Sequence, residues 1–299
     1  MKFNKWLIKL SLPLLGGYVL IQNRMLKTEN YKIKCSRLPK GFEGCRIVLL
    51  ADLHKKTFGY GDCNLINSVA AAQPDLIFFS GDLYSRSEKK LMPKLKLMKR
   101  LSKLAPVYYA AGNHELGDIR RFDLFCKRLK GLGIHVLRNR SEKIYRGGDS
   151  ADVYGAELPL EYYVDPNGGF KHISELTGEK LTELLGSPKK TACTMLIAHD
   201  PLFLKAYSRW GADIVFSGHV HGGMIRLPVV GGLLSPERKF FPRYTKGLYK
   251  LGRTTMALTA GLGRFRLNNP SQIMLITLTR DDIPVKRPKG EKWFLDVKE

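Results

Sequence analysis

The stretch "DLIFFSGDLY", from Asp75 to Tyr84, joins an apolar run to a polar turn. Its centre, Leu76 to Phe79, is typical of a strand that is buried on both faces of a sheet. Asp82 follows at the tip of that strand. Turns favour Asp because its side chain bonds to nearby backbone, but a carboxylate held at a strand tip can also serve as a ligand. The rest of the chain decides between these two interpretations.

The same arrangement, an apolar run before a polar tip, recurs on either side of this stretch. "CRIVLLAD" (Cys45–Asp52) and "PVYYAAGN" (Pro106–Asn113) also predict buried strands. Helical spacing is found at 64–72, at 88–104, where Pro93 falls in the first turn, and at 120–133. Strands that alternate with helices predict a parallel sheet covered by helices. We expect a polar linker at about 27–40 to precede this sheet.

The second half of the chain predicts shorter elements and a more mixed sheet. Strands are expected at 134–139, 143–147, 152–157, 191–200, 212–219, 223–228, 254–261 and 271–278, with a loop at 158–170 and a helix at 173–186. The sequence contains no internal repeat. We therefore expect one α/β domain.

The charge balance points to an anionic partner. The 299 residues include 50 Lys and Arg against 27 Asp and Glu, a net charge of +23. This excess suits nucleic acid, an acidic membrane face or a phosphorylated substrate, and it also suits a solvated basic surface without a partner. The sequence shows no nucleic-acid-binding module and no interleaving of aromatic and basic residues, so nucleic acid is disfavoured.

The five cysteines are odd in number and form no CxxC pair. This pattern argues against a disulfide framework and against a zinc ribbon. A Cys35–Cys45 bridge would require an exported domain. Unpaired cysteines favour the cytoplasm.

An apolar segment, Trp6 to Ile21, opens the chain between basic residues. It is shorter than the roughly 20 apolar residues of a membrane span. We expect residues 1–26 to form an apolar helix that is a membrane anchor or an uncleaved signal-like helix, and residues 27–299 to form the domain. A helix packed on the domain is the alternative. The positive-inside rule favours the cytoplasmic face, although exported proteins also begin with a basic residue before a short apolar core.

Five predicted strands end in residues that can bind a metal. These tips are Asp52-Leu53-His54, Gly81-Asp82, Asn113-His114-Glu115, His199-Asp200 and His219-Val220-His221. They hold five of the seven histidines, and we expect the other two, His135 and His172, to be structural or surface residues. Ligands bind at the carboxyl ends of strands in open α/β sheets. The five tips therefore favour Asp82 as a ligand over Asp82 as a simple turn residue.

The motifs "ADLH", "GDLY", "GNHE", "AHD" and "GHVH" resemble, in order and spacing, those of the calcineurin-like metallophosphoesterases. The resemblance spans about Arg46 to Leu278. It implies two packed mixed β-sheets flanked by helices, a four-layer sandwich, with two divalent metal ions at the strand ends. It further implies ligand roles for each tip: Asp52, His54 and His221 for the first metal, Asn113, His199 and His219 for the second, and Asp82 as the bridge between them.

This ligand set favours particular metals and a particular chemistry. Oxygen and imidazole ligands together suit manganese, iron or zinc better than magnesium or calcium. The resemblance implies a metal-dependent phosphoester hydrolase that acts by a metal-bridged hydroxide. His114 would be the catalytic residue that assists the leaving oxygen. Glu115 would orient His114 or nearby backbone, or would be an ordinary first-turn acid of a helix.

Three arginines are weaker candidates for substrate contacts. Arg86 follows Asp82, and Arg264 and Arg266 lie in "GRFRLNNP", which we expect at the rim of the site. Each of the three could equally belong to a solvated basic surface.

The motifs favour one branch of the resembling family. Lys55 follows His54, and "GDLYSRS" departs from the second motif of the phosphoprotein phosphatases. The apolar N-terminus and "SGHVHGGMIRLP" look like the bacterial membrane-associated phosphodiesterase branch, some members of which hydrolyse UDP-2,3-diacylglucosamine in lipid A biosynthesis. Tyr162, Tyr163 and Phe170 would suit a lipid-linked or nucleotide-type substrate of this kind. A nuclease or broad-specificity phosphatase of the same superfamily, and a non-catalytic metal-stabilised binding protein, remain as alternatives.

Overall fold

The strands assemble into two sheets in the computed structural model, which describes residues 5–165, 169, 173–189, 193–227, 231–236, 238–264, 266–280 and 295–296. Sheet A has the spatial order β1 (Leu26–Lys34), β14 (Ser271–Thr279), β2 (Arg46–Leu50), β3 (Leu76–Ser80), β4 (Val107–Ala110) and β5 (His135–Val136). Sheet B has the order β15 (Leu295–Asp296), β12 (Gly247–Leu251), β13 (Thr254–Leu258), β9 (Ile214–Ser217), β8 (Thr194–Ala198), β7 (Asp149–Ala156) and β6 (Arg140–Arg146). A small hairpin joins β10 (Ile225–Leu227) to β11 (Gly231–Leu234).

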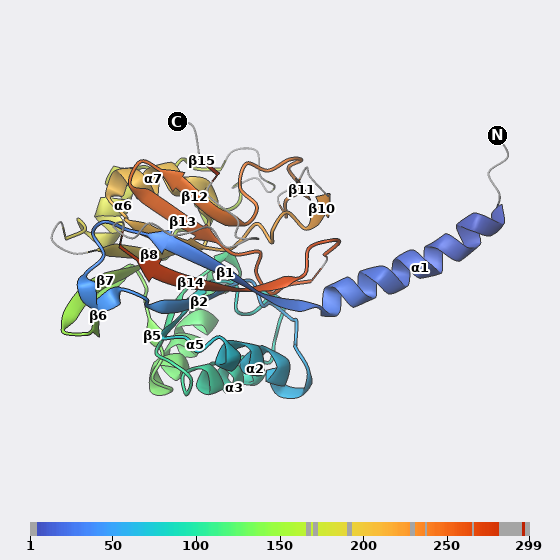
Figure 1. Cartoon of the computed structure of the whole chain (residues 1–299), viewed down its shortest axis with the longest axis horizontal. Helices are drawn as coiled ribbons and strands as arrows, with labels where there is room; N and C mark the ends of the chain where they lie inside the picture. The colour runs from blue at the N-terminus through green and yellow to red at the C-terminus, as the bar shows by residue number, and fades with distance from the viewer. Residues whose placement is uncertain are drawn as a thin grey trace.

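Helices cover the outer face of each sheet (Figure 1). Sheet A is covered by α2 (Cys63–Ala71), α3 (Met92–Leu101) and α5 (Ile119–Gly131), and sheet B by α6 (Gly178–Leu185) and α7 (Leu204–Trp210). The short helix α4 (Asn113–Leu116) follows β4 directly, and α1 (Lys5–Arg24) projects away from the domain (Figure 1).

The period of two along each strand explains the layers. Val48 and Leu50 of β2 pack under the helices of sheet A, while Ile47 and Leu49 face sheet B. In β8 the same alternation sends Ile197 towards sheet A and Leu196 towards α6 and α7. Because both faces of both sheets are buried, the central strands are apolar throughout. The predicted architecture, two mixed sheets flanked by helices in four layers, is confirmed.

Parallel pairing brings the strand tips together. β2, β3 and β4 run parallel in sheet A, as do β8 and β9 in sheet B. The carboxyl ends of parallel neighbours lie at the same edge of a sheet. The three motif-bearing tips of sheet A therefore lie at one edge of that sheet, and the two of sheet B lie at one edge of theirs.

The predicted linker at 27–40 is wrong over most of its length. Residues Leu26–Lys34 form β1, which pairs in parallel with β14 along nine residues. Tyr31 and Ile33 point into the space between the sheets, whereas Lys32 between them is exposed. The strand was not predicted because lysines alternate with its apolar residues and make the segment look polar. A strand at the edge of a sheet needs only one apolar face.

Other elements differ in extent from their prediction. The helix expected at 173–186 begins only at Gly178, where the Thr177 side chain accepts a hydrogen bond from the Lys180 amide. The sequence interpretation did not include α7 or β12. No disulfide is present among the five cysteines, and Cys35 lies beside Cys193, with 3.8 Å between the two sulfur atoms, rather than beside Cys45.

Within the described ranges, no helix combines the length and the apolar character that crossing a membrane requires.

Candidate metal centre

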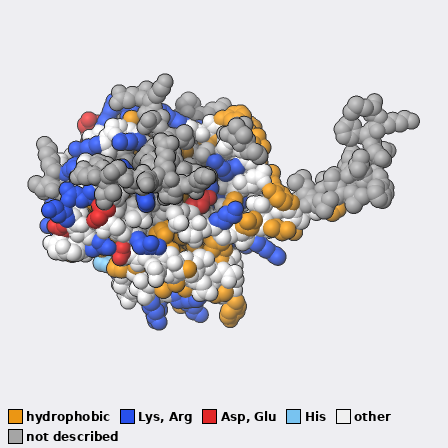
Figure 2. Space-filling view, in the orientation of Figure 1, with side chains coloured by type: hydrophobic (Ala, Val, Ile, Leu, Met, Phe, Trp, Pro, Cys, Tyr) orange, Lys and Arg blue, Asp and Glu red, His pale blue; other side chains and the backbone are white. Residues whose placement is uncertain are grey.

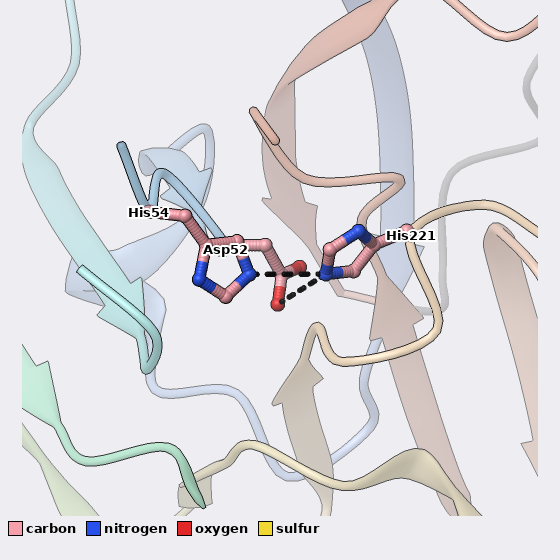
Figure 3. Close-up of side chains that lie close together, drawn as sticks. All are labelled: Asp52, His54 and His221. Carbon is pink, nitrogen blue, oxygen red and sulfur yellow. Dashed lines mark hydrogen bonds and ion pairs between the residues drawn. The ribbon is translucent and has the colours of Figure 1, made fainter. Parts of the chain in front are cut away.

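Side chains from the tips of both sheets converge in one cluster. Asp52 and His54 follow β2 and His221 follows β9, and Figure 3 shows how these three side chains turn towards one another. The Nε2 atoms of His54 and His221 are 3.2 Å apart, and His221 Nε2 lies 3.6 Å from Asp52 Oδ1. Such spacing between ligand atoms can place all three around one cation.

Asp82 occupies the middle of the cluster. Its Oδ2 atom lies 3.7 Å from His54 Nε2, 3.3 Å from His199 Nε2 and 3.9 Å from His114 Nε2. His199 Nε2 also lies 3.8 Å from Asp52 Oδ1. Asp82 thus faces imidazoles from sheet A on one side and from sheet B on the other.

The donor atoms of the cluster fit divalent cations. His199 Nδ1 lies 2.6 Å from the Ser80 carbonyl, which fixes Nδ1 as the donor and turns Nε2 towards the two carboxylates. His199 Nε2 and Asn113 Oδ1 are buried without a hydrogen-bond partner in the described part of the chain. A backbone carbonyl behind a ligating histidine is the usual arrangement at metal sites.

The titration behaviour agrees with this fit. Burial lowers the pKa of His54 to about 4 and holds that of His221 well below its ordinary value, so both rings keep a free lone pair at neutral pH. Burial alone would also lower the pKa of His199, but the Asp82 and Asp52 carboxylates raise it to about 10. A cation bound among these groups would displace that proton, since metal and proton compete for the same lone pair.

The backbone at the strand tips is held in an unusual conformation. Asp52, His54, Asp82, His219 and His221 all have φ between 50° and 72°. This left-handed region is sparsely populated by residues other than glycine, although Asp, Asn and His tolerate it best. Each such residue costs on the order of 1 kcal/mol or more, and this strain is typical of functional sites.

Backbone amides hold the two aspartates in place. Asp82 Oδ1 accepts a hydrogen bond from the His114 amide at 2.9 Å, and Asp52 Oδ1 accepts one from the His219 amide at 3.1 Å. Gly112 packs so closely that a Cβ atom there would lie 2.3 Å from Asp82 Oδ1.

Glu115 is buried behind the cluster and orients backbone. Its carboxylate accepts hydrogen bonds from the amides of Gly112 at 2.8 Å, Asp82 at 2.9 Å and Tyr84 at 3.3 Å. Burial and the nearby Asp82 carboxylate raise the pKa of Glu115 to about 8, although the amide donors oppose the rise. Glu115 therefore ties the tip of β3 to the tip of β4.

His114 is held with its Nε2 atom on the side of the cluster. Its Nδ1 accepts a hydrogen bond from the Arg86 amide at 3.1 Å, so the ring proton resides on Nε2 when the ring is neutral. The ring packs edge-on against His54, with 4.6 Å between the ring centres. About a third of the side chain is exposed. Nε2–H can therefore donate to a group that enters the site.

The three arginines differ from one another. Arg86 and Arg264 are exposed, and their guanidinium groups donate to the carbonyls of Asn113 and Lys55, respectively. Arg266 was expected near the rim in contact with substrate or with the ligand residues, and the rim position is wrong because Arg266 is only 1% exposed. It lies behind the cluster, where its guanidinium donates to the carbonyls of Gly263 and Ala260 at 2.6 Å and to that of His221 at 3.5 Å.

The cluster opens into a pocket of about 570 Å³, which we call the metal pocket. Besides the tip residues it is lined by Lys55, Ser85, Tyr163, Met224, Pro236 and Arg264. Tyr163 packs edge-on against His219, and its buried hydroxyl has no hydrogen-bond partner in the described ranges.

Several of these contributors were missed by the sequence interpretation. Ser85, Met224 and Pro236 carry no recognisable signal. Lys94 of α3 is buried and donates to the His54 carbonyl, yet it looks like any lysine of a basic helix.

The remaining predicted residues lie elsewhere. His135 stacks on Tyr108 and pairs with Glu142 at 2.6 Å, away from the cluster. Asp200 caps the turn after β8 by accepting from the Leu202 amide. His172 and Phe170 lie outside the described residues.

Comparison with known proteins agrees with this geometry. Residues 45–223 match the family model described as calcineurin-like phosphoesterase. An uncharacterized metallophosphoesterase of Bacillus subtilis, YkuE, is 27% identical over 84% of this chain and 85% of its own. The phosphodiesterase YaeI of Escherichia coli is 26% identical over 78% of this chain and 82% of its own. A zebrafish "transmembrane protein with metallophosphoesterase domain" is 27% identical over 84% of this chain, which spans 57% of that relative.

Proposed function

The chain belongs to the calcineurin-like phosphoesterase family and is a metal-dependent phosphoester hydrolase, and from this premise we propose that it is a two-metal phosphodiesterase. One observation carries the proposal. Asp82 Oδ2 lies 3.7 Å from His54 Nε2 and 3.3 Å from His199 Nε2, and this spacing supports a bridging role for the Asp82 carboxylate.

The proposed ligands divide into two sets around this bridge. Asp52, His54 and His221 would hold one cation. Asn113, His199 and His219 would hold the other. Manganese, iron or zinc suits this mixture of oxygen and imidazole. Divalent cations bound there would polarise phosphoryl oxygens and acidify water.

His114 would act on the leaving group. Its Nε2–H points into the metal pocket while the Arg86 amide fixes Nδ1. A donor in this position can protonate or hydrogen-bond the departing alkoxide, a role worth roughly 10²–10⁴ in rate. Arg264, which lines the metal pocket, and Arg86, beside His114, would attract the phosphate and the rest of an anionic substrate.

The substrate class we propose is an amphiphilic phosphodiester or pyrophosphate. Tyr163, Met224 and Pro236 add apolar surface to the lining of the metal pocket, beside its charged residues. UDP-2,3-diacylglucosamine, which carries sugar, acyl and nucleotide groups, is the first physiological compound to test. Residues 1–26 would hold the chain at a membrane surface, and residues 27–299 would form the hydrolase domain.

Hydrolysis of bis-p-nitrophenyl phosphate tests the chemistry. The full chain would be stripped of metal and assayed alone, with Mn²⁺ and with Zn²⁺, beside p-nitrophenyl phosphate as a monoester. We expect metal-dependent diester cleavage that Asp82→Ala abolishes and that His114→Ala lowers roughly 10²-fold or more. His135→Ala, a histidine paired with Glu142 outside the site, should keep full activity.

Two results would contradict the proposal. Undiminished cleavage by Asp82→Ala would exclude a bridging role for this carboxylate. Full metal occupancy without any diester cleavage would leave a metal-stabilised binding protein as the better description.

A further inference from the structure

A second pocket, which we call the base pocket, lies where α1 meets the domain. Its volume is about 730 Å³. Three cationic side chains line it, Arg24 from the last turn of α1, Lys56 from the loop after β2, and Arg264. None of the described residues that line the base pocket is acidic. Such a concentration of one sign of charge favours an anion.

Lys56 is the strongest indication that the base pocket binds an anion. Its side chain is about 5% exposed, and its Nζ atom donates to Ser271 Oγ at 2.5 Å and to the Gly263 carbonyl at 3.4 Å. Over the ranges that the structure covers, no carboxylate forms an ion pair with Lys56. A buried ammonium group that lacks a counter-charge is costly. An anion seated in the base pocket would supply that charge.

Another wall of the base pocket is apolar. Val19 and Leu20 of α1, together with Leu26 and Phe58, line it beside the cations. Leu20 and Ile21 are more than half exposed, so the same end of α1 presents apolar surface to solvent. Figure 2 shows hydrophobic and basic side chains side by side where α1 joins the domain. A ligand that satisfies both walls is an amphiphile with an anionic head.

The base pocket is formed before any ligand arrives. Asn23 donates from Nδ2 to the Arg266 carbonyl at 3.1 Å and accepts from the Arg266 amide at 3.2 Å, which fixes the last turn of α1 to the loop after Gly263. Arg264, in that same loop, lines both the base pocket and the metal pocket. The two pockets therefore share a rim.

We propose that the base pocket binds the phosphate head group of a membrane amphiphile, such as an anionic phospholipid. The phosphate would lie among Arg24, Lys56 and Arg264, and the acyl chains would lie along Leu20 and Leu26. Binding of this kind would turn the mouth of the metal pocket towards the lipid surface. The ligand is held and not hydrolysed, so the inference stands apart from the proposed phosphodiesterase activity.

Co-sedimentation with vesicles tests this assignment without reference to catalysis. The metal-loaded full chain would be mixed with phosphatidylcholine vesicles, with and without about one fifth phosphatidic acid. We expect Arg24→Gln to weaken binding to the acidic vesicles about fivefold and Lys56→Gln to weaken it about tenfold. Lys250→Gln, an exposed lysine on β12 of sheet B, is the matched control and should bind like the unchanged chain.

Competition distinguishes a lipid head group from free phosphate. Dihexanoyl phosphatidic acid should displace the chain from acidic vesicles, whereas the same concentration of inorganic phosphate should not. Equal losses in Arg24→Gln and Lys250→Gln would overturn the proposal, because general attraction by the +23 charge would then explain binding. Equal displacement by inorganic phosphate would overturn the amphiphile. Arg24 is exposed, so this variant remains a fair test even where Lys56→Gln fails to fold.

Discussion

Sheet A and sheet B both supply ligand atoms to the metal centre, but the atoms differ in kind. The tips of β2, β3 and β4 bring Asp52, Asp82 and Asn113, which provide all the oxygen atoms of the cluster, together with His54 and His114. The tips of β8 and β9 bring imidazoles, His199, His219 and His221, while Asp200 is used to cap a turn. In the proposed centre, sheet A would therefore balance the charge of the cations, and sheet B would complete their coordination with imidazole nitrogens.

This division shows that neither sheet alone provides all the side chains of the cluster. His199 reaches Asp82 and Asp52 only because Ile197 and Phe216 of sheet B pack against Phe78 and Leu49 of sheet A. The apolar contact between the sheets sets the distances within the polar cluster.

The largest expected effect is at Asp82 of sheet A, the proposed bridging carboxylate. We expect Asp82→Asn to lower diester hydrolysis by more than about 10³-fold, because it removes a negative charge that would face both proposed cations. This exceeds the 10–100-fold loss that is typical of residues which only hydrogen-bond to a metal ligand. Metal content, measured by mass spectrometry, should fall with activity. Asp123→Asn, which alters a surface aspartate paired with Arg138, should change neither.

Removing a proposed ligand of sheet B should lower activity less than changing Asp82. His199→Ala removes one neutral ligand from one cation, and we expect a loss of roughly 10²-fold that high metal concentration partly restores. Measuring kcat at rising Mn²⁺ checks this. A loss equal to that of Asp82→Asn, with no recovery, would break the distinction between the sheets.

Glu115 tests how sheet A holds its own tips. Above pH 8, where the Glu115 carboxyl is ionised, Glu115→Gln replaces an acceptor of three backbone amides by a group with one acceptor oxygen and an NH₂ that faces donors. We expect an activity loss of about 10–100-fold and a free energy of unfolding lower by about 1–3 kcal/mol. Urea denaturation alongside the assay measures both. An unchanged variant would show that the amides of Gly112 and Asp82 need no carboxylate.

The smallest expected effect comes from a steric contact at Gly112, and it concerns the free energy of unfolding. Gly112 has a φ of −106°, so alanine is conformationally allowed there, but its Cβ would meet Asp82 Oδ1 at 2.3 Å. We expect Gly112→Ala to lower the free energy of unfolding by about 2 kcal/mol. Gly131→Ala, at the last residue of α5 with no atom near its added Cβ, should instead be stabilising by roughly 0.4–1 kcal/mol. Thermal unfolding compares the two directly, and the same sign in both would contradict the packing argument.

Some features of the molecule could not be found by pattern. β1 was missed because its buried residues, Tyr31 and Ile33, alternate with the polar residues Asn30, Lys32 and Lys34, and only pairing with β14 shows that they face a core. Arg266 was placed at the rim because arginines are usually exposed, whereas the carbonyls of Gly263 and Ala260 hold it inside. The contact of Cys35 with Cys193 joins residues 158 positions apart, and no local signal reports such a pairing.

The apolar runs of the sequence by themselves determined an α/β domain with a parallel first half and a more mixed second sheet, and the group of side chains at the strand tips, while the resemblance to the family implied the four layers. Apolar runs fix the strands, and a strand tip is a local feature that six or eight residues reveal. Only the tertiary structure decided which nitrogen of His114 faces the site, which carboxylate stands in the middle, and where α1 forms a second pocket. These depend on hydrogen bonds and contacts between residues far apart in the chain, such as Arg86 with His114 and Asn23 with Arg266. Local periodicity carries no information about contacts of that kind, because they exist only once the two sheets have packed.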